Sequence, residues 1–108
     1  MLFRSNDAFG WQALYNNTTG ANNVGIGYGA LTANTIGTAN VAVGTVALVS
    51  NTTGSYNTGI GFNVMNNNTT GQQNSCIGTQ ALYALNGGSG NTALGYVAGA
   101  GKIGRAHV

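Results

Sequence analysis

The sequence predicts an all-β fold, a parallel β-solenoid (β-roll) of about six coils of 17 residues each, and three observations predict it. First, Asn and Gly each recur every 17 residues without an insertion, at Asn6, Asn23, Asn40, Asn57, Asn74 and Asn91 and at Gly10, Gly27, Gly44, Gly61, Gly78 and Gly95. Second, apolar and small residues alternate after each recurring Asn, which is the two-residue period of a strand. Third, the chain contains 19 Gly and no Pro, so no residue would remove a hydrogen bond from a stacked ladder.

The strand of each coil is predicted to follow the recurring Asn. In one copy Val24, Ile26 and Tyr28 occupy alternate positions, and small or polar residues fill the positions between them. The polar stretch that follows, Asn-Thr-Thr-Gly at 51–54, is typical of a corner. A helix-pair repeat would need more than about 30 residues and better helix formers. Each repeat is therefore predicted to be one coil of strands and corners.

Stacking of the coils explains the composition of the repeat. Coils that stack about 4.8 Å apart place equivalent residues above one another, so the Asn series would form a hydrogen-bonded ladder. The recurring Gly would occupy corners that need positive φ or exclude a Cβ. We expect Ile60 and Phe62 to fill the coil interior, and Asn57, Gly59 and Gly61 to form a flat face that another sheet can approach.

The repeat pattern divides the chain into three parts. Residues 1–5 are predicted to be an irregular N-terminal edge, residues 6–101 the solenoid array, and residues 102–108 a tail that is not native. The tail is interpreted in this way because residues 103–108 back-translate to ATC GGA AGA GCA CAC GTC, which resembles a common sequencing-library adapter. The array still runs where this tail begins, so we expect the chain to be a fragment of a longer protein.

The sequence lacks the side chains that most chemistry needs. The charged residues are Arg4, Asp7, Lys102 and Arg105, and the single His and Cys are His107 and Cys76. No acid–base pair, nucleophilic triad, metal site or cofactor site is predicted, so we expect no catalytic activity. A basic footprint for nucleic acid and an apolar run that would contact a membrane are both missing from the sequence.

Two rows of residues are candidates for binding. Thr18, Thr35, Thr52 and Thr69 would form a ladder that presents a regular surface to ice or to glycans, and the alternative is that they only complete a β-surface. Trp11, Tyr28, Phe62 and Tyr96 share another column, interrupted by threonines, and either stack on carbohydrate or pack in the core or at its rim. Cys76 stands in a column of Ala and Gly, so we expect it to replace a small buried or interface residue.

The strand segments resemble a known adhesin repeat. Asn23-Val24-Gly25-Ile26-Gly27, the stretch 40–44 and the stretch 91–95 are similar to the Ser-Val-Ala-Ile-Gly repeat of trimeric autotransporter adhesin heads (YadA-like heads), and also to repeats of phage tail fibres. The resemblance covers about residues 5–101. It implies a left-handed parallel β-roll, three chains of which pack side by side into a rod. The family's head repeat is typically shorter than 17 residues, so a larger coil or a longer outer loop is implied here.

These observations lead to one expectation and one alternative for function. The expectation is a non-catalytic structural and adhesive segment of an extracellular fibre, on a bacterial surface or a virion. Its expected partners are further copies of the chain, preferably in a trimer, and a host-surface protein or glycan. The alternative is a monomeric ligand-binding β-solenoid that binds ice or glycans.

Overall fold

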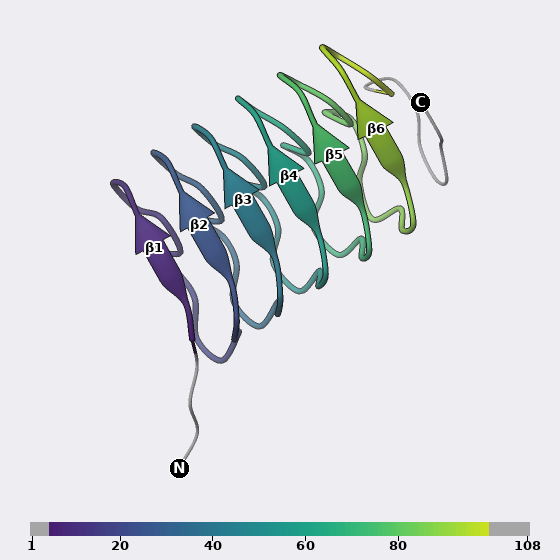
Figure 1. Cartoon of the computed structure of the whole chain (residues 1–108). Coiled ribbons are helices and arrows are strands. Elements are labelled where there is room, and N and C mark those ends of the chain that lie inside the picture. The colour runs from purple at the N-terminus through teal and green to yellow at the C-terminus, as the bar shows by residue number, and fades with distance from the viewer. Residues whose placement is uncertain (1–4, 100–108) are drawn as a thin grey trace.

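The computed structural model describes residues 5–99, and within them every regular element is a short strand. The strands are β1 (Asp7–Phe9), β2 (Val24–Ile26), β3 (Val41–Val43), β4 (Thr58–Ile60), β5 (Ser75–Ile77) and β6 (Thr92–Leu94). They form one parallel sheet in chain order, and each residue pairs with the residue 17 positions later, as Gly25 does with Ala42 (Figure 1). The predicted all-β parallel solenoid with a 17-residue period is confirmed, with about five complete turns between the six strands.

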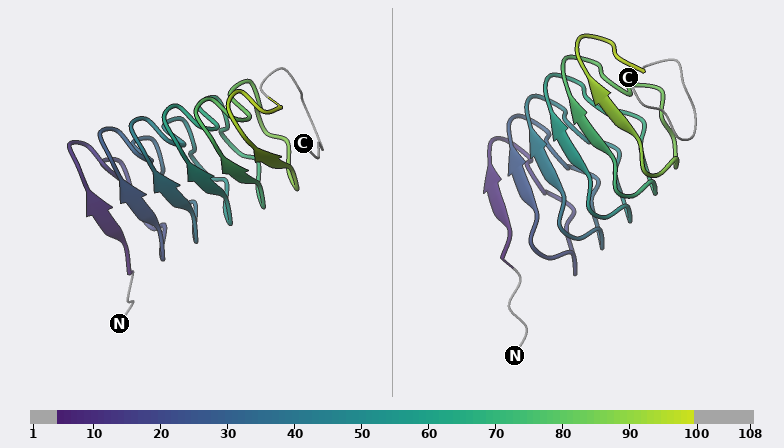
Figure 2. Two further views of the ribbon diagram at one scale, coloured as in Figure 1. Left: turned by 45° about the horizontal axis from the view of Figure 1, so that its top comes forward. Right: turned by 45° about the vertical axis from the view of Figure 1, so that its right-hand side comes forward.

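Each coil is narrow and has two walls. The strands form one wall, and the turns that return the chain to the next strand form the other (Figure 2). The whole array measures 41 × 22 × 15 Å, so only one layer of side chains fits between the walls. Because a single coil encloses so little apolar material, each coil is stabilised by the coils above and below it.

The interior is filled mainly from the turn wall. Large apolar side chains there are buried in a column, which consists of Leu14, Leu31, Leu48, Met65 and Leu82. They pack against the central residue of each strand, which is small. In β4 this residue is Gly59, where a Cβ would lie only 3.0 Å from Val64 Cγ1 and 3.2 Å from Met65 Cε. The strand wall therefore has small residues inside because the opposite wall supplies the bulk.

The predicted orientation of the strand faces was wrong. Ile60 and Phe62 were expected inside, but they are 37% and 51% exposed, whereas Asn57 and Gly59 are buried. Large and small residues do alternate between the two faces of the strand, but in so thin a coil the small residues face inward. Leu and Met from the turn wall occupy the space that Ile60 would need, and the Asn57 amide is buried because all its polar atoms have hydrogen-bond partners.

The recurring Asn residues lie in a ladder that replaces part of the backbone pairing. The backbone N–H of each Asn from Asn23 to Asn91 donates to Oδ1 of the Asn 17 residues earlier, at 2.9–3.0 Å. Each side-chain Nδ2 from Asn6 to Asn74 donates in turn to a Gly carbonyl 14 residues later, at 2.8–2.9 Å. The ladder therefore joins successive coils and also ties the strand to the corner of the same turn.

A second Asn ladder lies at the corner before each strand. Nδ2 of Asn34, Asn51 and Asn68 donates to Oδ1 of the Asn one coil earlier, at 2.8–3.1 Å. The ladder ends at Leu85, which is buried at the next equivalent position and has no amide. Within residues 5–99 Asn68 Oδ1 is consequently buried without a hydrogen-bond partner.

The end of every strand requires glycine. The Gly row from Gly10 to Gly95 has φ values between +119° and +138°, a region that L side chains rarely adopt. A Cβ on Gly44 would also lie 2.5 Å from the Gly61 carbonyl oxygen. The turn wall adds left-handed residues that are not glycine, and Leu31, Leu48 and Met65 have φ between +47° and +54°. This alternation of backbone hand lets the wall curl tightly while its side chains point inward.

Candidate interaction surface

The outer face of the strand wall is largely apolar, and it carries no charge from β2 to β6. We call it the free sheet face, and it consists of two rows of side chains. One row is Asp7, Val24, Val41, Thr58, Ser75 and Thr92, and the other is Phe9, Ile26, Val43, Ile60, Ile77 and Leu94. Ile26, Ile60 and Ile77 in the middle of the second row are 41%, 37% and 47% exposed. Contiguous apolar surface of this kind is typical of interaction sites.

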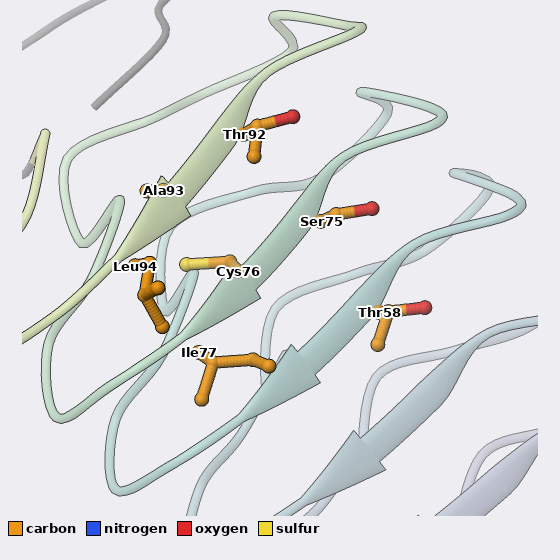
Figure 3. A pocket seen from close by; sticks show the side chains of 7 residues that line it. All are labelled: Thr58, Ser75, Cys76, Ile77, Thr92, Ala93 and Leu94. Carbon is orange, nitrogen blue, oxygen red and sulfur yellow. The ribbon is translucent and has the colours of Figure 1, made fainter.

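A shallow hollow interrupts the free sheet face over β4–β6. It has a volume of about 210 Å³ and is lined by Thr58, Ser75, Cys76, Ile77, Thr92, Ala93 and Leu94. In Figure 3 the hydroxyl-bearing side chains of Thr58, Ser75 and Thr92 follow one line, and Ile77 and Leu94 lie on the other side of it. Ser75 is the smallest residue of its row, which leaves space for an apolar side chain from a partner.

The aromatic residues predicted as a row lie on the surface rather than in the core. Trp11, Tyr28, Phe62 and Tyr96 are 61%, 55%, 51% and 78% exposed. The rings of Trp11 and Tyr28 stack, with their centroids 5.0 Å apart and their planes 16° apart. Packing in the core is therefore wrong for this row, whereas packing at the rim and stacking on carbohydrate, which the sequence also allowed, both agree with this exposure. The row lies one residue past the glycines that end the strands, beside the free sheet face.

The threonine ladder is engaged in hydrogen bonds between coils. Oγ1 of Thr18, Thr35 and Thr52 donates to the carbonyl oxygen of the Thr one coil later, at 3.0–3.2 Å, and Thr69 Oγ1 donates to Asn86 Oδ1 at 3.0 Å. Backbone N–H groups of the same corners donate to these carbonyls as well. The hydroxyl protons that an ice- or glycan-binding surface would offer are therefore used within the fold.

The single thiol is buried and unreactive in character. Cys76 is the central residue of β5 and is 1% exposed, in the column of small residues where the sequence placed it. Burial raises the pKa of this thiol from 9.0 to about 12. Since the thiolate is the reactive form, Cys76 is suited to packing rather than to nucleophilic or redox chemistry.

The described residues contain no cluster suited to a metal ion. Among residues 5–99 no three His, Cys, Asp or Glu side chains gather at one place, and no helix has the length and apolar character needed to cross a bilayer. Lys102, Arg105 and His107, and with them the predicted tail at 102–108, lie outside the described residues.

Sequence reasoning missed the free sheet face, because it assigned its larger row to the interior. A usable signal was present in the sequence, since a second apolar column of Leu or Met directly follows the column of Ala30, Ala47, Val64 and Ala81 and can fill the core from the turn wall. No family model, no curated protein and no solved structure matches the chain.

Proposed function

We propose that the chain is a structural and adhesive segment of an extracellular fibre, formed by copies of the chain that pack through their free sheet faces, preferably as a trimer. The observation that carries this proposal is the row of exposed Ile and half-buried Val side chains on the outer face of β2–β5, which is uncharged. Burying such a surface stabilises an assembly by roughly 25 cal/mol per Å² of apolar area.

A second copy of the chain suits this face better than an unrelated partner does. The two rows recur at the same spacing from β2 to β6, so copies of the chain placed in register around a common axis meet coil by coil at the same height. Symmetric self-association repeats each favourable contact in every chain. The threefold arrangement is supported by the resemblance to trimeric adhesin heads, and it would place the turn walls on the outside of a rod.

The absence of charge in the array fits a projecting role. No residue between Ala8 and Gly101 is charged, so stacked coils of neighbouring chains meet without like-charge repulsion. The outer corners, rich in Thr, Asn and Ser, would then present neutral polar surface to a host protein or glycan. We propose an extracellular location, on a cell surface or a virion, for the same assembly.

Disulfide trapping tests which face joins the chains. In a Cys76→Ala background, Ile60→Cys places a thiol on the free sheet face, and Thr53→Cys places one at an exposed corner as the matched control. Mild oxidation should link chains of the Ile60→Cys protein covalently on a non-reducing gel and leave the Thr53→Cys protein as single chains. Equal linking of both variants, or none in Ile60→Cys, would contradict the proposal.

A further inference from the structure

The exposed aromatic row is interrupted by a threonine between Tyr28 and Phe62. Trp11 covers one face of the Tyr28 ring, at a centroid distance of 5.0 Å that matches the coil spacing. The other face of Tyr28 is turned toward the next coil, where the row holds Thr45, an exposed residue too short to cover it. Phe62 follows in the coil after that and is 51% exposed. We call this space, with Tyr28 and Phe62 as walls and Thr45 as floor, the Thr45 slot.

The distance between the two walls of the Thr45 slot determines how thick a ring must be to contact both. Equivalent positions two coils apart lie about 9.6 Å from one another, which is twice the spacing of stacked strands. A flat aromatic ring midway between the walls would lie about 4.8 Å from each, close to the 5.0 Å that separates the stacked rings of Trp11 and Tyr28, and would stack only loosely on both. A pyranose chair is thicker, because its axial C–H bonds project from both faces, and it therefore reaches both walls.

The chemistry of the walls defines the class of sugar. The face of an aromatic ring is electron-rich and attracts the positive edge of a C–H bond. A sugar held between two rings must present C–H bonds on both faces, which is the case when every hydroxyl is equatorial. The floor adds the Thr45 hydroxyl, which can donate and accept a hydrogen bond. An anionic sugar would find no cation here, because residues 8–101 are uncharged.

We propose that the Thr45 slot binds a neutral, β-linked glycan of all-equatorial sugars, with one pyranose ring between Tyr28 and Phe62. The row continues with Thr79 and Tyr96 in the next two coils, so the same spacing recurs toward the C-terminal side. This site lies beside the free sheet face, and the inference does not depend on self-association.

The experiment is a titration of the full chain with cellotetraose, followed by saturation-transfer NMR. β-1,4-Mannotetraose, which differs in an axial hydroxyl at C2, serves as the ligand control. We expect saturable binding of cellotetraose and at least about tenfold weaker binding of the mannose oligomer, a difference of about 1.4 kcal/mol.

Two substitutions at one position make the test specific. Thr45→Tyr fills the slot with a ring, as Tyr28 fills the place next to Trp11, and should abolish cellotetraose binding. Thr45→Ala leaves the slot open and should retain most of it. Tyr28→Ala and Phe62→Ala should each weaken binding about tenfold or more, and Tyr56→Ala, at an exposed tyrosine outside the row, should not change it.

Circular dichroism and solution mass establish that each variant keeps the fold and the oligomeric state of the wild type. Binding by Thr45→Tyr equal to that of the wild type would overturn the assignment of the slot. Failure of the wild type to bind cellotetraose saturably would overturn the proposed ligand class, and neither result would affect the proposed role of the free sheet face.

Discussion

The buried Asn ladder should make Asn57 one of the most sensitive polar positions in the chain. In the structure Asn57 Oδ1 accepts the backbone N–H of Asn74 at 3.0 Å, and Asn57 Nδ2 donates to the Gly71 carbonyl at 2.8 Å. Asn57→Ala removes both bonds, together with one from Asn74 Nδ2 to Asn57 Oδ1 at 3.0 Å and one from Asn57 Nδ2 to Asn51 Oδ1 at 3.4 Å. Asn74 Nδ2 and Asn51 Oδ1 each keep another partner. The Gly71 carbonyl keeps a second donor, Asn68 Nδ2 at 3.2 Å, whereas the Asn74 N–H has no other acceptor.

The expected cost follows from this count. A buried donor left without an acceptor costs about 1–3 kcal/mol, and the lost bond to Gly71 adds about 1 kcal/mol, so Asn57→Ala should destabilise the fold by roughly 2–4 kcal/mol. Asn67→Ala is the matched control, because the Asn67 side chain is exposed, and it should change stability by no more than about 0.5 kcal/mol. Denaturant unfolding followed by circular dichroism measures both.

Asn57→Asp provides a test of the donor alone. A carboxylate still accepts the Asn74 N–H but faces the Gly71 carbonyl, whereas the protonated acid can donate to it. The folded state therefore favours the protonated acid and raises its pKa. The stability of this variant should be highest below the ordinary carboxyl pKa of about 4 and fall as pH rises through it.

The wild-type chain is a suitable background for this titration, because Asp7 is its only Asp or Glu residue. An Asn57→Ala protein within about 0.5 kcal/mol of the wild type would refute the reasoning, since surface substitutions commonly cost as little. A stability of Asn57→Asp that rises with pH between 3 and 6, roughly the range spanning carboxyl ionisation, would also refute it.

Three further predictions concern the packing of the coil. Gly44→Ala should cost at least about 3 kcal/mol in denaturant unfolding, because it combines φ +133° with a Cβ 2.5 Å from the Gly61 carbonyl oxygen; a cost below about 1 kcal/mol would contradict the backbone geometry. Gly59→Ala should destabilise the fold, because its Cβ would lie 3.0 Å from Val64 Cγ1. The double variant Gly59→Ala, Val64→Ala should recover about 1 kcal/mol or more of that loss. If the effects of the two substitutions on the free energy of unfolding are strictly additive, the two residues do not compete for space. The buried Cys76 thiol, whose pKa is raised to about 12, should resist alkylation in the folded protein and react fully after unfolding, and rapid labelling of the folded protein would contradict the burial. The free energy of unfolding should fall as pH rises above about 9, and the Cys76→Ala protein should lose that part of the pH dependence.

The architecture of the chain was predictable from the sequence because stacking repeats every constraint. Six Asn and six Gly at one spacing leave only one register, and the structure pairs residues at that spacing throughout β1–β6. The burial of Cys76 was predictable for the same reason, since its column otherwise holds Ala and Gly. Residues at the same position of successive coils therefore indicate whether that position is buried, even where one of them is a different residue type.

The inside and the outside of the coil were not predictable from alternation alone. Alternation says that Ile60 and Gly59 point to opposite sides, but it does not say which side is the core. The answer depends on the left-handed backbone conformation of Leu48 and Met65 in the turn wall. Their side chains are buried and fill the interior. Leu and Met rarely adopt positive φ, so no local propensity indicates this geometry.

We propose that the free sheet face joins copies of the chain, and the mass of the full chain in solution is the most direct test of this proposal. Light scattering after gel filtration should give about three times the 10.8 kDa of one chain, and Ile60→Lys, which places a charge on that face, should return the mass to that of a single folded chain. A wild-type mass of one chain, or a wild-type assembly that Ile60→Lys leaves intact, would contradict the account.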